Sequence, residues 1–323
     1  MGACLQNELG GNNMQIDFFL TLQKVAVLFL LIVIGFVAGK TKLISESGQK
    51  DITQLVLYIT MPATIFTAMQ LEMNQERLNT ALAILAIMVF CYTVVFTVGL
   101  LVSRKLPLSD GRKDIFQTAL LLSNTSFMGY PIIQSLLGEE ALFYAVVGAG
   151  FIFEVVSWSL GVYLISRNSP TTATINIRKI ILSPGILSII VGLIFFIGQW
   201  SVPEPVNSVI NTMAPATSPL AMIVIGLMLS RSNIKEAFQN PILYLAAGVK
   251  LLVVPIIITV ILKAFDVSGP QLVIPVMMIS MPTASYVAMF SSNYGNDGKF
   301  ASQIVFLSSL LSMITIPLVT LLF

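Results

Sequence analysis

The chain has 323 residues, of which 56% are hydrophobic and only 10% are charged, and its mean hydropathy is +0.91. Soluble domains carry about 25% charged residues, so this deficit over the whole length indicates an all-α polytopic membrane protein. The absence of histidine excludes Ser-His and Cys-His catalysis and HExxH zinc sites. We expect no cofactor and no metal. The net charge of +2 gives no reason to expect a nucleic-acid partner.

The N-terminal residues 1–15 are predicted to form a short polar tail. No Lys or Arg precedes the first apolar run, so a signal peptide is poorly supported. The two cysteines, Cys4 and Cys91, lie in a polar and an apolar context respectively. This difference argues against a disulfide framework.

Ten segments are long and apolar enough to cross a bilayer, for which about 20 residues are needed. In chain order they are 17–39, 52–71, 78–102, 115–137, 141–166, 181–200, 206–229, 241–264, 270–292 and 300–323. Their connections are short and polar, and no soluble domain fits between them.

Basic residues lie almost entirely on one side of these spans. Thirteen of the 17 Lys and Arg residues follow odd-numbered spans: Lys40, Lys42, Lys50, Arg104, Lys105, Arg112, Lys113, Arg167, Arg178, Lys179, Arg231, Lys235 and Lys299. By the positive-inside rule those loops are cytoplasmic. An even number of spans then places both termini outside, in a multi-pass membrane protein.

An internal repeat is visible in the second and seventh spans. The sequence ITMPATIF at 59–66 and the sequence NTMAPATSPL at 211–220 share Thr-Met followed by Pro-Ala-Thr. The fourth and ninth spans carry a second matching irregularity, with predicted helix breaks at Gly129, Pro131 and Pro282. Two five-helix halves, each odd in number, must have opposite orientations. Paired interrupted helices in inverted repeats are typical of secondary transporters.

The two predicted breaks are surrounded by polar side chains that could bind a solute. Broken backbone at membrane depth survives only where protein buries it or where it lines a cavity. The N-terminal end of each resumed helix offers free N–H groups and partial positive charge, which suits an anion. The candidate residues are Asn124, Thr125, Ser126 and Tyr130 at one break, and Ser280, Thr283, Ser285 and Tyr286 at the other. For any single Ser or Thr, a purely structural interhelical bond is the simpler interpretation; for Asn124 we favour substrate binding.

Charged residues inside the spans are the remaining candidates. Lys250 and Glu154 both fall near the predicted midplane, where charge is costly and faces the interior. They could pair with each other, or Lys250 could attract an anion while Glu154 carries a coupling proton. Lys24 is close enough to its span end to reach outward to the interface.

At this point the motifs resemble a known family. NTSFMGYPII (124–133) resembles the N-T-x-x-M-G-x-P motif of the auxin efflux carrier family, which includes plant PIN carriers and bacterial malate permease-like proteins. SMPTASYVAMFSSNYG (280–295), VKLLVVPII (249–257) and APATSPLAMIVIGLML (214–229) are similar to its ninth, eighth and seventh helices. The likeness covers essentially all ten predicted spans.

The resemblance implies two inverted five-helix repeats, 16–168 and 181–323, joined by a cytoplasmic linker at 169–180. Helices 1, 2, 6 and 7 would form a scaffold, and helices 3–5 and 8–10 a transport domain in which broken helices four and nine cross. It implies an elevator-type movement, with the substrate carboxylate held by the helix-four Asn, which is Asn124 here. Plant members have Pro-Gln-Gly where this chain has Pro282-Thr283-Ala284, and many have a long cytosolic loop. These departures favour a carrier of the bacterial inner (plasma) membrane over an auxin carrier.

The function expected from these observations is secondary transport of a small organic anion, a carboxylate or a dicarboxylate such as malate. The lipid bilayer is its other partner, and a homodimer is compatible with this arrangement. The alternative is a Na⁺ or proton antiporter on a similar crossed-helix scaffold, using Glu154. An intramembrane enzyme ranks last because no nucleophile–base pair or paired carboxylates are visible, and no phosphate-binding loop supports ATP-driven pumping.

Overall fold

The structure, a computed structural model, describes residues 18–170, 177–231 and 234–323. Within these ranges it is almost entirely helical, and its one β-type pairing is an isolated antiparallel bridge between Ser123 and Thr283. The predicted N-terminal tail and residues 171–176 of the predicted linker lie outside the described residues.

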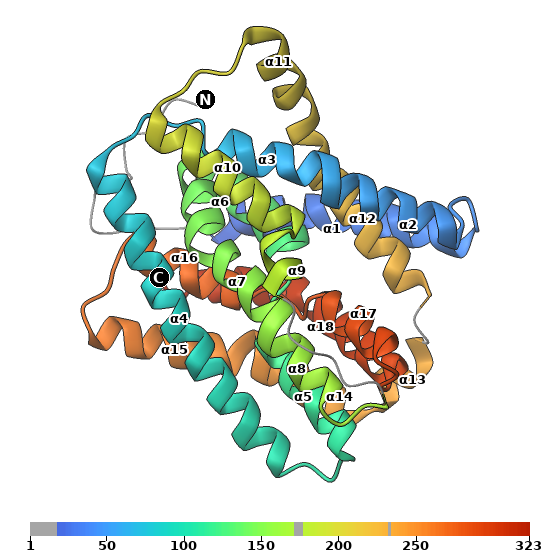
Figure 1. Cartoon of the computed structure of the whole chain (residues 1–323). Helices are drawn as coiled ribbons and strands as arrows, with labels where there is room; N and C mark the ends of the chain where they lie inside the picture. The colour runs from blue at the N-terminus through green and yellow to red at the C-terminus, as the bar shows by residue number, and fades with distance from the viewer. Residues whose placement is uncertain (1–17, 171–176, 232–233) are drawn as a thin grey trace.

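The helices follow the predicted spans closely (Figure 1). In the first half they are α1 (Phe18–Lys40), α2 (Glu46–Leu55), α3 (Met61–Ala68), α4 (Gln75–Arg104), α5 (Asp110–Leu121), α6 (Tyr130–Tyr144), α7 (Phe151–Val156) and α8 (Val162–Ser166). In the second half they are α9 (Ile177–Ile181), α10 (Pro184–Gly198), α11 (Glu204–Met213), α12 (Thr217–Ser230), α13 (Ile234–Gln239), α14 (Pro241–Gly248), α15 (Val254–Ala264), α16 (Pro270–Ile279), α17 (Tyr286–Asn293) and α18 (Gly298–Thr320).

Short π-type turns join several of these helices into longer runs, among them Val56–Thr60, Thr125–Gly129 and Val249–Val253. Such turns are rare in proteins, and those that occur are often found at functional sites. The run through α6 turns at Gly138, where φ is +85°. Glycine adopts this conformation without steric cost, so the residue separates the predicted fourth and fifth spans.

In the described residues, six helical runs are long and apolar enough to cross a membrane. They are Phe18–Lys40, Gln75–Arg104, Thr125–Ser166, Glu204–Ser230, Pro241–Ala264 and Gly298–Thr320. Two shorter apolar helices, α10 and α16, accompany them. The protein is therefore an all-helical, multi-pass membrane protein, since lipid leaves backbone groups no partners outside the helix itself.

The outward surface of α1 shows why the helices require lipid. Val27, Leu30, Val33, Ile34 and Val37 are all more than half exposed. A water-soluble protein rarely exposes a continuous apolar stripe of this size. The opposite side of α1 packs tightly against α12.

Glycines allow α1 and α12 to approach closely. A Cβ atom added at Gly226 would lie 2.0 Å from the carbonyl oxygen of Ile32, and one added at Gly35 would lie 2.2 Å from that of Ile223. Small residues at such crossings bring two backbones into contact, which is the main source of helix association in membranes. The pair α1–α12 is therefore closely packed along the contact.

A second close pair joins α3 to α10, which lie side by side in Figure 1 with α11 projecting beyond them. Here a Cβ at Gly192 would lie 2.3 Å from the sulfur of Met69.

The two Pro-Ala-Thr motifs meet beside this pair. The hydroxyl oxygens of Thr64 and Thr217 are 2.8 Å apart, and the Thr64 hydroxyl also donates to the carbonyl of Ala214 at 2.9 Å.

A polar cluster joins the ends of α5 and α8, where the sequence predicts the cytoplasmic side. Asp114 is 1% exposed, and its carboxylate accepts hydrogen bonds from Arg167 and, at 2.7 Å, from Asn168. We call these three residues the Asp114 clasp. Beside it, Arg112 of α5 pairs with Asp297 at 2.7 Å, and the Asp297 carboxylate also caps α18.

Candidate functional site

The two predicted broken helices cross through their interruptions, residues 122–124 and 282–284. The N–H of Asn124 donates to the carbonyl of Pro282 at 2.7 Å, and the N–H of Ala284 donates to the carbonyl of Leu122 at 2.8 Å. These bonds form the isolated antiparallel bridge centred on Ser123 and Thr283. Each interruption therefore supplies the backbone partners that the other would otherwise lack in the membrane.

Side chains extend this reciprocal arrangement to the preceding helices. The Ser123 hydroxyl donates to the carbonyl of Ile279 at 3.1 Å, and the Thr283 hydroxyl donates to the carbonyl of Ala119 at 3.0 Å. The pairs have the same spacing, because 283 − 123 and 279 − 119 both equal 160. Ser123 and Thr283 thus occupy equivalent places, each bonding the C-terminal end of the opposite half's helix.

Backbone donors remain unpaired where the helices resume after the crossing. Among the hydrogen bonds of the described residues, none uses the N–H of Ser126, Phe127, Ser285 or Tyr286. The first N–H groups of a helix have no partner within it, and here no neighbouring group replaces that partner. These donors are suited to an acceptor that is not part of the protein.

Asn124 lies beside these donors with its side chain unpaired. The residue is 3% exposed, and no hydrogen bond of its amide group occurs in the part of the chain that the structure describes. A hydrogen bond to a charged group contributes about 1.5–3 kcal/mol, so an anion would be a favourable partner for this amide.

The other predicted site residues lie in three different settings. Thr125 and Thr283 use their hydroxyls on backbone carbonyls, of Ser123 at 3.3 Å and Ala119 at 3.0 Å respectively. Ser126 is 6% exposed, while Ser285 is half-buried immediately before α17. The structure thus brings all four to the crossing, with two of the hydroxyls already committed to the backbone.

Tyr130 differs, because its hydroxyl lies against Gly150, where an added Cβ would be 1.9 Å away. Gly150 belongs to the π-type turn that leads into α7. The hydroxyl also interacts with the side chain of Ser126 at the crossing, so Tyr130 stays a predicted site residue.

The break in the fourth span lies upstream of where the sequence predicts it. Gly129 has helical dihedral angles, and Pro131 lies in the first turn of α6. The extended residues are instead 122–124. The π-type turn Thr125–Gly129 continues directly into α6, so Pro131 does not interrupt the helix. Pro282 does lie in the break of the ninth span, as predicted.

Lys250 reaches the crossing from the π-type turn between α14 and α15. Its side chain is fully buried, and its Nζ donates to the carbonyl of Leu120 at 2.7 Å and to the hydroxyl of Ser123 at 2.6 Å. Among the described residues, no ion pair joins Lys250 to Glu154. The sequence left open whether these two charges pair, and in this structure they do not.

Glu154 of α7 lies against the start of α10. It is 4% exposed, and its Oε2 accepts a hydrogen bond from Trp158 at 3.1 Å. A Cβ added at Gly185, in the first turn of α10, would lie 3.0 Å from Oε1. Tyr286 interacts electrostatically with Glu154, and its ring stacks on that of the neighbouring Phe153, with the ring centroids 5.7 Å apart.

One contributor was missed from the sequence. Ser123 was not singled out, although it precedes Asn124 in the same polar run, and only the crossing shows that its hydroxyl bonds the opposite helix. Lys24, predicted to reach outward to the interface, donates to the carbonyl of Ser135 in α6. Because these hydrogen-bond partners are far apart along the chain, the local sequence around each residue does not indicate the bond.

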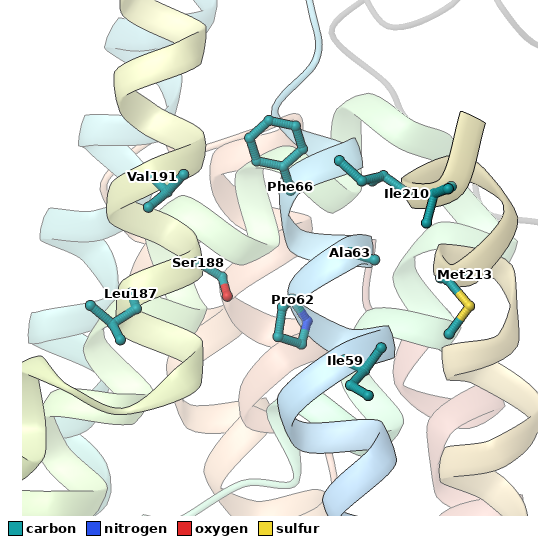
Figure 2. Close-up of a pocket in the computed structure, with 10 residues that line it drawn as sticks. Ile59, Pro62, Ala63, Phe66, Leu187, Ser188, Val191, Ile210 and Met213 are labelled. Carbon is teal, nitrogen blue, oxygen red and sulfur yellow. The ribbon is translucent and has the colours of Figure 1, made fainter. Parts of the chain in front are cut away.

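An apolar cavity of about 380 Å³ lies away from the crossing, between α3, α10 and α11 (Figure 2). Pro62, Phe66, Val191 and Met213 are among its lining residues. Its one hydroxyl, on Ser188, already donates to the carbonyl of Pro184 at 2.6 Å. Because no polar group remains free, this cavity does not suit a carboxylate.

Comparisons with known proteins agree with the sequence resemblance. The family described as "Membrane transport protein" matches residues 20–174 and 164–320. An "Uncharacterized transporter" from Methanothermobacter thermautotrophicus is 23% identical over 300 residues, covering 92% of this chain and 96% of the relative. A "Putative malonate transporter" from Rhizobium meliloti is 24% identical over 299 residues, covering 89% and 91%. The predicted auxin efflux carrier (PIN-like) membership is confirmed: the chain belongs to this family of membrane transport proteins.

Proposed function

We propose that this protein is a secondary transporter that carries a small organic anion across the cell membrane. The observation that carries the proposal is the set of unpaired donors at the crossing. These are the Asn124 amide and the N–H groups of Ser126, Phe127, Ser285 and Tyr286. A carboxylate accepts several hydrogen bonds of this kind, and hydrogen bonds to an ionised group are the stronger ones.

The charge around the crossing favours an anion over a cation. Residues 119–131 and 279–291 contain no Asp or Glu, which a Na⁺ or proton site would normally use. Two helix N-terminal ends meet there instead, each carrying roughly +0.5 charge. The substrate would bind with its carboxylate toward Asn124, and Ser126 and Ser285 would contribute hydroxyls.

For the architecture we propose ten spans in two inverted repeats, with both termini outside. Two observations support it: the contact of Thr64 with Thr217, 153 positions apart, and the reciprocal bonds of Ser123 and Thr283. Repeat-related residues meet in this way on a pseudo-two-fold axis. The close pairs α1–α12 and α3–α10 would form the scaffold, and α4–α8 with α14–α18 the transport domain. Movement of the second against the first would carry the site across the membrane.

The proposed substrate class is a mono- or dicarboxylate. Malonate is the first compound to test because one relative of nearly the same length bears its name, and malate is the second.

A second candidate function, cation or proton antiport, is favoured by one observation. Glu154 is a nearly fully buried carboxylate that interacts with two hydrogen-bonding side chains, Trp158 and Ser183. It lies between α7 and α10, which the proposal assigns to different domains. A carboxylate at such a place could bind a proton in one state and release it in the other.

The decisive test is uptake of radiolabelled malonate and malate by purified protein in liposomes. Asn124→Ala should weaken affinity about 10- to 100-fold, because a hydrogen bond to a charged group contributes about 1.5–3 kcal/mol. Asn207→Ala, on exposed α11, is the matched control and should transport like wild type.

Two results would count against the proposal. Unchanged affinity in Asn124→Ala would remove the site from the crossing. Collapse of an imposed Na⁺ or proton gradient by wild-type liposomes, without any organic anion and without carboxylate uptake, would establish the antiporter instead.

A further inference from the structure

Lys250 links the two helices that end at the crossing. Its Nζ donates to Leu120, the penultimate residue of α5, and to the Ser123 hydroxyl, which itself donates to Ile279, the last residue of α16. One ammonium group thus bonds one helix C-terminal end directly and the other through a single hydroxyl.

The electrostatics of this arrangement are one-sided. Each helix C-terminal end carries about −0.5 charge, and cations are stabilising near it. The four helix ends at the crossing therefore divide into two negative ends beside Lys250 and two positive ends beside Asn124. The lysine compensates the two negative ends.

Burial separates Lys250 from any solute. The residue is 0% exposed, and two of its three donors are bonded at 2.7 Å or less. Asn124, by contrast, is 3% exposed and its side-chain amide has no hydrogen-bond partner among the described residues. To bind an anion directly, Lys250 would have to give up its bonds to Leu120 and Ser123, which hold the crossing together.

We propose that Lys250 is a positioning residue for anion transport and not a ligand of the anion. It holds the C-terminal ends of α5 and α16 together, so that Asn124 and the free N–H groups keep a fixed geometry. This inference rests on the proposed function, and it replaces the sequence-based expectation that Lys250 attracts the substrate itself.

The test compares Lys250→Met with Leu251→Met, a neighbouring buried substitution that removes no charge. Malonate is the dianionic probe, and its monomethyl ester, used as a competitor of uptake, is the monoanionic one. Lys250→Met should raise the KM for malonate and the inhibition constant of the ester by the same factor, about tenfold, because it disturbs the shared carboxylate site. Adding Lys250→Met to Asn124→Ala should then cause little further loss.

A direct ligand would behave differently. If Lys250→Met strongly raises the KM for malonate and leaves the inhibition constant of the monomethyl ester unchanged, the lysine contacts the substrate directly and the proposal is overturned. Full wild-type kinetics in Lys250→Met would overturn it as well. Failure of the proposed function is distinct, since wild-type protein would then transport no carboxylate.

A second measurement does not depend on transport. Hydrogen–deuterium exchange without substrate should accelerate in both 119–130 and 279–290 in Lys250→Met, but not in Leu251→Met. If Lys250→Met does not fold, Ser123→Ala replaces it: this change keeps the charge and removes the bond to Ile279, and the same two segments should exchange faster. Exchange unchanged in both segments would contradict the linking role.

Discussion

Equivalent residues in the two halves have different chemistry at the crossing. Ser123 and Thr283 are both hydroxyl residues with matching bonds. Asn124, however, is matched at the same spacing, 284 − 124 = 160, by Ala284. The side-chain amide of the proposed site therefore comes from one half alone. The backbone geometry needs a hydroxyl in each half, whereas the amide is required by no bond within the described protein.

The need for glycine at the α1–α12 contact can be tested with single substitutions. Gly226→Ala should destabilise the protein by about 1–3 kcal/mol, the usual cost of overpacking a close contact, because the new Cβ would lie 2.0 Å from the Ile32 carbonyl. Gly248→Ala is the matched control: it is also helical, nothing lies within 4 Å of its Cβ position, and alanine is the better helix former. Thermal unfolding in detergent should separate the two variants; equal midpoints would show that the contact is not tight.

At the scale of elements, each broken helix is stabilised by the other. Residues 122–124 could not remain extended in a membrane without the acceptors and donors of 282–284. Away from the crossing, the Asp114 clasp joins α5 to α8. Both joints hold the helices that carry the proposed site.

Asp114→Asn tests the second joint. It should lower stability by about 1–3 kcal/mol, less than the 3–5 kcal/mol typical of a fully buried pair, because the Arg167 side chain is 33% exposed and solvent screens part of the interaction. Lys50→Met is the control. It removes the ion pair between Lys50 and Glu46, whose side chains are about 70% exposed, and should change stability by less than about 0.5 kcal/mol. A thermal shift that is the same for both variants would contradict the clasp.

For the whole molecule, the proposed division into two moving parts makes opposite predictions for two cross-links. Thr64 and Thr217 are both in the proposed scaffold, whereas Lys24 in α1 bonds the Ser135 carbonyl of α6 in the proposed transport domain. A bond across the second pair must break when the transport domain moves. Cross-linking therefore distinguishes the two classes of contact.

The cross-links are made in a background without Cys4 and Cys91. A protein cross-linked between Thr64→Cys and Thr217→Cys should still transport. Lys24→Cys with Ser135→Cys, joined by a bismaleimide, should lose transport and regain it when a cleavable linker is cut. The measurement is malonate uptake before and after linking. Retained transport in the second pair would rule out movement between these parts.

Much of the fold follows from the sequence alone. Apolar segment lengths predict spans such as 241–264, which matches α14–α15 at both ends, because membrane burial is a property of local composition. Boundaries shift where caps act: the second span begins earlier than predicted because Ser45 caps α2 at Gly48. Asn124 was identified as a site residue from its place in a polar interruption.

The tertiary structure alone decided where the fourth span breaks and what Lys250 does. Gly129 and Pro131 are local signals of a break, yet both are helical, since the interruption at 122–124 is determined by pairing with residues 160 positions away. The bonds of Lys250 to Leu120 and Ser123 likewise join segments about 130 residues apart. Composition and periodicity report on a residue's own segment, whereas hydrogen-bond partners across a crossing depend on how distant segments meet.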